Sequence, residues 1–142
     1  MSTDNFWKKS FERDIRDTPQ KIWNAFVDIS RWGLWNPGVK SIHMEGDFVP
    51  GVWFSMELPE GNIIRSQLIE VSEGKYFTDE TRVGETMVRV QHYIEPLHSG
   101  LSRVIYIINT QGSDAQAFGE GVSADFPDVL AGLEKYLTEQ TG

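Results

Sequence analysis

Turn-forming residues recur through the middle of the chain about every dozen residues, which is the spacing of successive antiparallel strands. These turn signals fall at residues 46–51, 59–62, 72–75, 83–84 and 98–100. The segments between them alternate apolar and polar side chains, as at Phe54, Met56 and Leu58 or at Val88, Val90 and His92. Alternation with a period of two is typical of strands that bury one face. This pattern predicts a run of antiparallel strands from residue 39 onward.

Residues 6–15 precede this run and read as a first strand. Thr18 and Pro19 then give the signature of a helix start, a capping hydroxyl followed by proline at the first helical position. Ser30 is expected to cap a second short helical turn that carries Trp32 and Trp35. The sequence therefore predicts two short helices after the first strand.

The end of the chain follows a helical rhythm. Apolar side chains recur there at the three- and four-residue spacing of one helix face: Phe118, Val122, Phe126, Val129, Leu130, Leu133 and Leu137. Pro127 interrupts the pattern because its ring would clash with the Ser123 carbonyl in a continuous helix. We expect the terminal helix to kink near Ser123 or to restart there, with Ser123 or Asp125 as its cap.

Composition narrows the classes of function. The chain of 142 residues is predicted to be a single domain, residues 1–142. Its 21 acidic and 13 basic side chains give a net charge of -8, which argues against a nucleic-acid partner because phosphate binding needs clustered Lys and Arg. The absence of cysteine excludes disulfides and thiol chemistry. The segment Met1–Lys9 lacks an apolar signal core, and no stretch is long and apolar enough to span a membrane. We expect a soluble cytoplasmic protein without integral membrane contact.

A sheet of about seven strands with one apolar face needs a cover, because exposed apolar surface costs roughly 25 cal/mol per Å². The terminal helix is the only long element that can supply it. A curved sheet around one helix leaves a space between them, and such a space is a typical ligand pocket. The fold class predicted from these patterns is α+β.

The order of these elements resembles the START-like helix-grip superfamily (SRPBCC), in particular its polyketide cyclase/dehydrase and lipid-transport branch. The segment 18–28, Trp32 to Trp35, and the run 36–39 carry the resemblance, together with Gly46, Gly51, His92 and Gly112. The resemblance implies a curved antiparallel sheet wrapped around a long C-terminal helix, with two short helices after the first strand. It implies no single catalytic signature, because the superfamily includes carriers, cyclases, hydrolases and receptors.

His92 and Tyr106 are the candidate functional residues, and each is a candidate catalytic residue. Both share the apolar face of their strands, and neighbouring strands of a meander would bring them together. His92 is a core histidine with a backbone or hydroxyl partner, a ligand anchor, or an acid/base group. The two side chains either hydrogen-bond each other or bind a ligand carbonyl or phenol.

The predicted ligand-binding set consists of inward-facing side chains from both helical regions and the strands. In helix-grip proteins the segment of Trp32 and Trp35 borders the mouth of the cavity, although the same residues could instead plug one end of the core. The full set is Phe26, Trp32, Trp35, Phe54, Met56, Val90, His92, Tyr106, Ile108, Phe118, Val122, Phe126 and Leu130.

Two weaker motifs carry no prediction of a site. The run from Gly119 to Ala124 matches a dinucleotide-binding pattern but lacks the flanking strands, so its glycines are expected to permit a bend and close packing. His43 and Glu45 are too few for a metal site, and His43 and His98 are expected to face water. We expect neither a cofactor nor a metal.

Three functions fit this sequence. The first is a binding or carrier protein for a small hydrophobic or aromatic molecule, with His92 and Tyr106 setting its orientation. The second is a polyketide cyclase- or dehydratase-like enzyme that uses the same cavity, with His92 or Tyr106 moving a proton. The third is a protein-partner module, which would show an exposed apolar patch instead of a cavity. The sequence also leaves a homodimer open and does not decide whether the protein is an enzyme.

Overall fold

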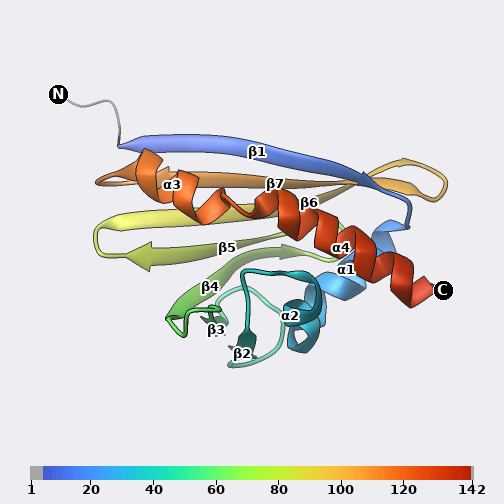
Figure 1. Cartoon of the computed structure of the whole chain (residues 1–142), viewed down its shortest axis with the longest axis horizontal. Coiled ribbons are helices and arrows are strands. Elements are labelled where there is room, and N and C mark those ends of the chain that lie inside the picture. Colours follow the sequence, from blue (N-terminus) through green and yellow to red (C-terminus); the bar gives the residue numbers. More distant parts are fainter. Residues whose placement is uncertain (1–4, 142) are drawn as a thin grey trace.

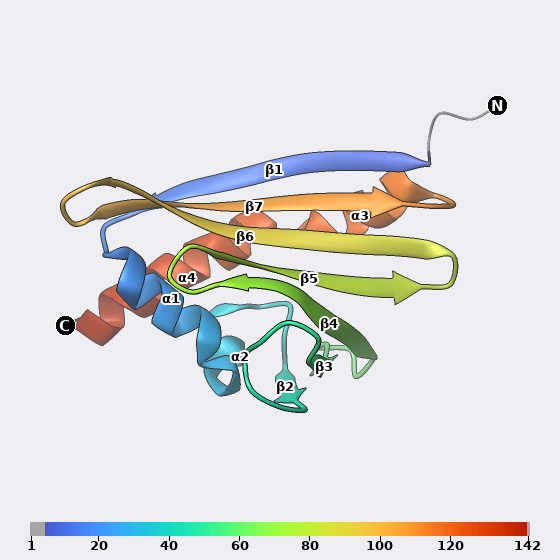
Figure 2. The same cartoon turned by 180° about the vertical axis from the view of Figure 1, so that it is seen from behind.

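The computed structural model describes residues 5–141 and contains one seven-stranded antiparallel sheet with helices on one of its faces (Figures 1 and 2). Residues 1–4 of the segment expected to lack a signal core lie outside the described residues. The strand order is β1-β7-β6-β5-β4-β3-β2. The strands are β1 (Phe6–Ile15), β2 (Ser41–Met44), β3 (Trp53–Glu57), β4 (Ile63–Ser72), β5 (Tyr76–Val83), β6 (Thr86–His98) and β7 (Leu101–Gln111).

The predicted strand run is confirmed, because every expected turn separates two paired strands. The tightest connections join β5 to β6 and β6 to β7. They contain Gly84 at a φ of 62° and Gly100 at a φ of 76°. These left-handed conformations favour glycine, which has no Cβ to clash with the backbone. The two turns close the long hairpins that form the centre of the sheet.

Two short helical segments follow β1, as expected. They are α1 (Pro19–Val27) and the pair η1 (Ile29–Arg31) and α2 (Trp32–Trp35). The Thr18 hydroxyl accepts a hydrogen bond from the Lys21 amide at 3.3 Å, which confirms the predicted cap. The expectation for Ser30 is wrong. Its hydroxyl donates to the Asp28 carboxylate at 3.1 Å, and the residue preceding α2 is Arg31.

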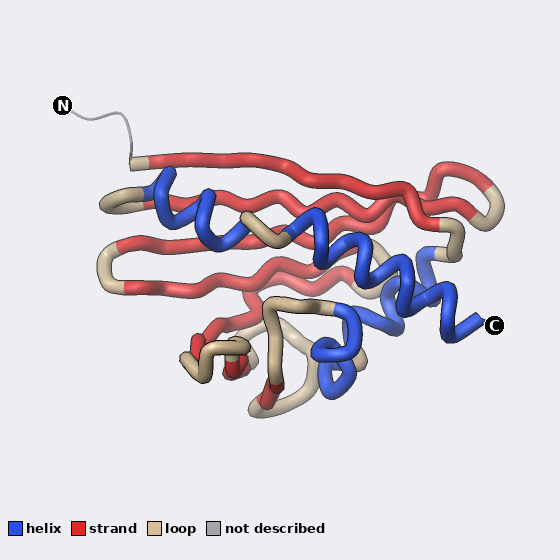
Figure 3. Tube along the Cα trace, in the orientation of Figure 1, coloured by secondary structure: helices blue, strands red, loops and turns tan. Residues whose placement is uncertain are grey.

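The C-terminal helix is divided where Pro127 predicted a break, into α3 (Ala115–Ser123) and α4 (Phe126–Thr141) (Figure 3). Pro127 lies in the first turn of α4, where it removes no intrahelical hydrogen bond. The Ser123 hydroxyl donates backwards to the Gly119 carbonyl at 2.7 Å. Ser123 therefore finishes α3 and does not cap α4.

The helix pair runs along β1, at one side of the sheet (Figure 1). Phe11 of β1 packs edge-on against Phe126 of α4, with ring centroids 5.4 Å apart. Arg13 of β1 forms an ion pair with Glu134 of α4 at 2.7 Å. The shorter helix α3 contacts β1, β6 and β7. The helix pair is thus offset from the β3–β5 side of the sheet.

Candidate functional site

The register of the central strands brings three titratable side chains to the helix-facing side of the sheet. His92 of β6 is the direct partner of Tyr106 of β7, and Phe77 of β5 is the partner of His92 on the other side. Asp79 lies two residues beyond Phe77 and therefore faces the same way. The rings of His92 and Tyr106 meet edge-on with centroids 4.5 Å apart, which confirms that these two residues are neighbours. We call Asp79, His92 and Tyr106 the interior polar cluster.

His92 is held by β5. Its ring stacks on Phe77, with centroids 3.9 Å apart and planes 8° from parallel, and Nδ1 lies 3.2 Å from the Phe77 carbonyl oxygen. A carbonyl oxygen only accepts, so Nδ1 carries the hydrogen in this contact. Burial lowers the pKa of His92 to about 3, against the opposing effect of the Phe77 and Val90 carbonyls. The imidazole is therefore neutral near pH 7, and its Nε2 is an acceptor.

Asp79 is a carboxyl group in an apolar environment. Its side chain is 14% exposed, and its Oδ2 lies 4.0 Å from His92 Nε2. That separation is too long for a hydrogen bond, and the neutral imidazole makes no ion pair. Asp79 makes no side-chain hydrogen bond within residues 5–139. Burial raises the pKa of Asp79 to about 7, so the group changes charge near neutral pH.

Tyr106 completes the cluster on β7 and is 3% exposed. Its ring packs edge-on against Phe126 of α4, with centroids 5.5 Å apart. Burial, together with the charge of Asp79, raises the pKa of its hydroxyl, which therefore stays protonated. Of the two alternatives for this pair, the mutual hydrogen bond is not present, and His92 bonds through Nδ1 to the Phe77 carbonyl. Within the described residues the Tyr106 hydroxyl has no hydrogen-bond partner.

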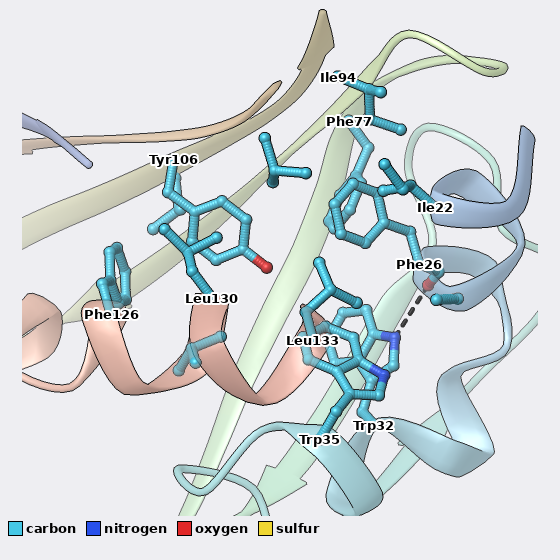
Figure 4. Close-up of a cluster of buried hydrophobic side chains, with 14 of the residues drawn as sticks. Ile22, Phe26, Trp32, Trp35, Phe77, Ile94, Tyr106, Phe126, Leu130 and Leu133 are labelled. Atoms are coloured by element: carbon cyan, nitrogen blue, oxygen red, sulfur yellow. Dashed lines mark hydrogen bonds between the residues drawn. The ribbon is translucent and has the colours of Figure 1, made fainter. Parts of the chain in front are cut away.

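The aromatic side chains expected to line a cavity pack against one another at the α1–α2 end of the fold (Figure 4). Phe26 is fully buried and lies between Trp35, at 6.4 Å, and Phe77, at 5.3 Å. Trp32 packs against Phe54 and donates its indole N–H to the Phe26 carbonyl at 2.9 Å. This geometry is that of a packed corner that plugs one end of the core.

The other predicted ligand-binding residues differ in exposure. Buried positions are Val90, Ile108, Phe126 and Leu130, whereas Met56 and Phe118 are half-buried. Val122 does not join this set, because it is 41% exposed. The buried positions of α3 are Ala115, Gly119 and Ser123, spaced four apart. Side chains at this spacing share one face of the helix, and Val122 lies outside that face.

Two surface hollows border the core, and neither includes the interior polar cluster. One, of about 380 Å³, lies between α1 and the end of α4 and is lined by Asp17, Lys21 and Tyr136, among others. The second, of about 320 Å³, lies between η1–α2 and β2 beside Leu34 and Ile42. Both are open to solvent and differ from the enclosed cavity expected beneath the helix.

The close packing expected of the glycine run is found at one of its positions. Gly119 and Gly121 lie inside α3, and a Cβ at Gly119 would overlap the Trp7 indole, so close packing explains this glycine. His43 and His98 are exposed. Among residues 5–141 no group of three or more His, Asp or Glu side chains is placed to hold a metal ion. None of the helices within this range is long and apolar enough to cross a membrane.

Sequence reasoning missed Asp79. Its signal is the alternation of Phe77, Asp79 and Thr81, which places an acidic side chain on the apolar face of a strand. Recognising that face required the pairing of Phe77 with His92, and this register is set by the length of the turn at Gly84.

The curved antiparallel sheet, the short helices after β1 and the long divided C-terminal helix form the helix-grip fold that the sequence predicted. The sequence itself matches no protein-family model and no curated protein. Solved structures with the same fold include a START superfamily protein from Mycobacterium smegmatis, at 10% identity and a TM-score of 0.77, covering 94% of this chain and 98% of the other. Norcoclaurine synthase from Thalictrum flavum, solved as a point mutant with a transition-state analogue, gives 9% identity, a TM-score of 0.78 and full coverage of both chains. The protein Ara h 8.0201 gives 15% identity and a TM-score of 0.75, covering 94% of this chain and 99% of the other.

Proposed function

We propose that this protein binds a small hydrophobic or aromatic molecule on the helix-facing side of its sheet, with the interior polar cluster as the anchor. The observation that carries the proposal is a set of polar groups on the apolar face of the sheet whose hydrogen-bonding capacity is unused within the described residues. Asp79 and the Tyr106 hydroxyl have no hydrogen-bond partner among the described residues, and His92 uses one of its two ring nitrogens. Buried polar groups are normally satisfied, so exceptions mark sites of function.

The surroundings of the cluster suit such a ligand. Apolar and aromatic side chains, including Phe77, Val90 and Phe126, adjoin the cluster and would contact the carbon skeleton of a bound molecule. The offset of α3 toward β1 supports an approach from the β3–β5 side, where Met56 and Thr81 are half-buried. Norcoclaurine synthase, which has the same fold, was solved with a transition-state analogue, and this supports ligand binding by analogy of fold.

Ligand retention from a mixed library of small aromatic and aliphatic molecules tests this proposal. The protein is incubated with the library, passed through a desalting column and examined by native mass spectrometry. We expect retained ligand, and we expect His92→Ala to weaken its binding about tenfold through loss of a hydrogen bond. His43→Ala is the matched control, because His43 is exposed on β2 and should bind as the wild type does.

A steric variant separates the interior site from adventitious surface binding. Thr81 is half-buried, and its hydroxyl contacts that of Ser66 at 2.6 Å on the helix-facing side. Thr81→Phe adds a ring beside Asp79 and should prevent retention. Equal retention by wild type and Thr81→Phe, or the retention of no library member, would refute the proposal.

A polyketide cyclase- or dehydratase-like enzyme is the second candidate, and Asp79 favours it. A carboxyl group with a pKa of about 7 suits general acid–base catalysis at neutral pH, because both protonation states are populated there. Norcoclaurine synthase shows that an enzyme is built on this fold. A poly-β-ketone thioester distinguishes the two candidates. A carrier binds it unchanged, whereas an enzyme cyclises or dehydrates it, and Asp79→Asn then slows turnover at least tenfold with little loss of binding.

A further inference from the structure

We propose that the ligand carries a basic nitrogen, bound as an ammonium group between the Asp79 carboxylate and His92 Nε2. This inference rests on the proposed binding function and names the chemical class of its ligand. It follows from the hydrogen-bonding roles of these two atoms, from the charges around them and from the aromatic rings beside them.

The first step is that two acceptors face each other. The Phe77 carbonyl takes the hydrogen on His92 Nδ1, so Nε2 of the neutral ring presents a lone pair. Asp79 Oδ2, which accepts when ionised, lies 4.0 Å from that lone pair. When Asp79 is ionised, both atoms are acceptors, and a donor placed between them would satisfy both. An ammonium group has three donor hydrogens and can serve both atoms at once.

The second step concerns charge. The titratable groups facing Asp79 are His92 from β6 and Tyr106 from β7, and both are neutral near pH 7. Its register neighbours on β4 and β6 are Leu68 and Val90, which carry no charge. A buried carboxylate is costly without a counter-charge, and the described part of this chain supplies none at the site.

The basic residues of the neighbouring strands are engaged elsewhere. Arg65 of β4 pairs with Glu45, and both Arg82 of β5 and Arg89 of β6 pair with Glu80 on the other side of the sheet. A ligand ammonium would therefore be the counter-charge of Asp79. A carboxylate ligand would be excluded by like-charge repulsion.

The third step is that aromatic rings surround the imidazole. Phe77 stacks on the His92 ring at 3.9 Å, and Phe26 lies 6.0 Å from it, edge-on. Aromatic faces attract cations and also pack well against an apolar ligand body. A hydrophobic or aromatic amine fits both features, because its nitrogen meets two acceptors and its carbon skeleton meets rings.

The pH dependence of binding follows from the same groups. Asp79 must be ionised to hold the ammonium, and its pKa before binding is about 7. Below that pH each bound ligand must displace a proton, so the affinity should fall about tenfold per pH unit. A neutral alcohol of the same size requires no ionisation and should keep its affinity over this range.

Naphthylmethylamine and naphthylmethanol form a matched pair of probes for this inference. Calorimetric titration of the wild type at pH 8 should show at least about tenfold tighter binding of the amine, as expected for a charge-assisted hydrogen bond. The preference should shrink as the pH falls from 7 to 5. Asp79→Asn, which keeps the shape of the side chain, should bind both probes with similar affinity. Asp47→Asn, a change at an exposed loop residue, should retain the preference.

The outcomes separate this inference from the function on which it rests. Equal binding of both probes by the wild type would overturn the amine assignment and leave the ligand-binding proposal standing. An amine preference that survives Asp79→Asn would place the amine elsewhere and would also overturn it. Failure of the wild type to bind either probe would refute both. The wild-type pH profile decides the question even if Asp79→Asn does not fold.

Discussion

Replacement of Asp79 by asparagine should stabilise the protein at alkaline pH. Asp79 has a pKa of about 7 in the folded protein, against an ordinary value of 3.8. Between these values the unfolded chain ionises the carboxyl group while the fold keeps it neutral, so the unfolded state binds fewer protons. The free energy of unfolding contributed by this group is therefore complete below pH 3.8 and is lost as the pH rises through 7.

The size of the loss follows from the two pKa values. They differ by about three pH units, and each unit corresponds to about 1.4 kcal/mol. The raised pKa of Asp79 thus costs the fold about 2 kcal/mol at pH 5, where the folded state must keep the group protonated, and about 4 kcal/mol by pH 8, where the folded state ionises it. Asparagine does not titrate and avoids this cost. The stability difference between Asp79→Asn and wild type should grow by about 2.5 kcal/mol from pH 5 to pH 8.

Urea unfolding of both proteins at pH 5, 6.5 and 8 measures this difference. His92 also titrates in the acidic range, because its pKa of about 3 in the fold lies below its ordinary 6.5. The titration of His92 changes the free energy of unfolding of both proteins equally while Asp79 is neutral, so it cancels in the difference between Asp79→Asn and wild type. Asp47→Asn should follow the wild type at each pH. A stability difference that does not change with pH would refute the argument that Asp79 is buried and without a counter-charge.

Two further predictions concern packing. Gly119→Ala should destabilise the protein by about 1–3 kcal/mol, because the new methyl group would overlap the Trp7 indole. Gly121→Ala in the same helix meets no atom within 4 Å and should stabilise the protein slightly. Equal free energies of unfolding of the two variants in urea would contradict this packing. Leu133→Ala should lower the free energy of unfolding by about 2–5 kcal/mol, because Leu133 is fully buried. Leu34 is 69% exposed, so Leu34→Ala should change the free energy of unfolding by less than about 0.5 kcal/mol in the same assay.

The sequence predicted the fold well because its local signals agree with one another. The bounds of β1, the cap at Thr18 and the break before Pro127 were all visible in short stretches of sequence. Each depends on chemistry within a few residues, such as a capping hydroxyl or a missing amide hydrogen. Ser30 shows the limit of this reasoning. A serine before a helical turn can also bond to a neighbouring carboxylate, and the Ser30 hydroxyl bonds to Asp28 instead of to a backbone amide.

The candidate site was only partly predictable, because it depends on contacts between strands. The inward direction of His92 and Tyr106 followed from alternation, and their pairing followed from the order of the strands. Asp79 could not be assigned without the register of β5 against β6. Val122 was expected to face the interior and is 41% exposed, because the buried face of α3 consists of Ala115, Gly119 and Ser123.

The pairing of β1 with β7 sets the order in which the molecule can assemble. Phe6 lies opposite Gln111, and Ile15 lies opposite Ser102. During synthesis β1 must therefore wait for β7, its partner in the described sheet, and for α4, because both are made about a hundred residues later. Contacts this distant in sequence slow folding, and the apolar side of β1 needs protection from aggregation in the interval.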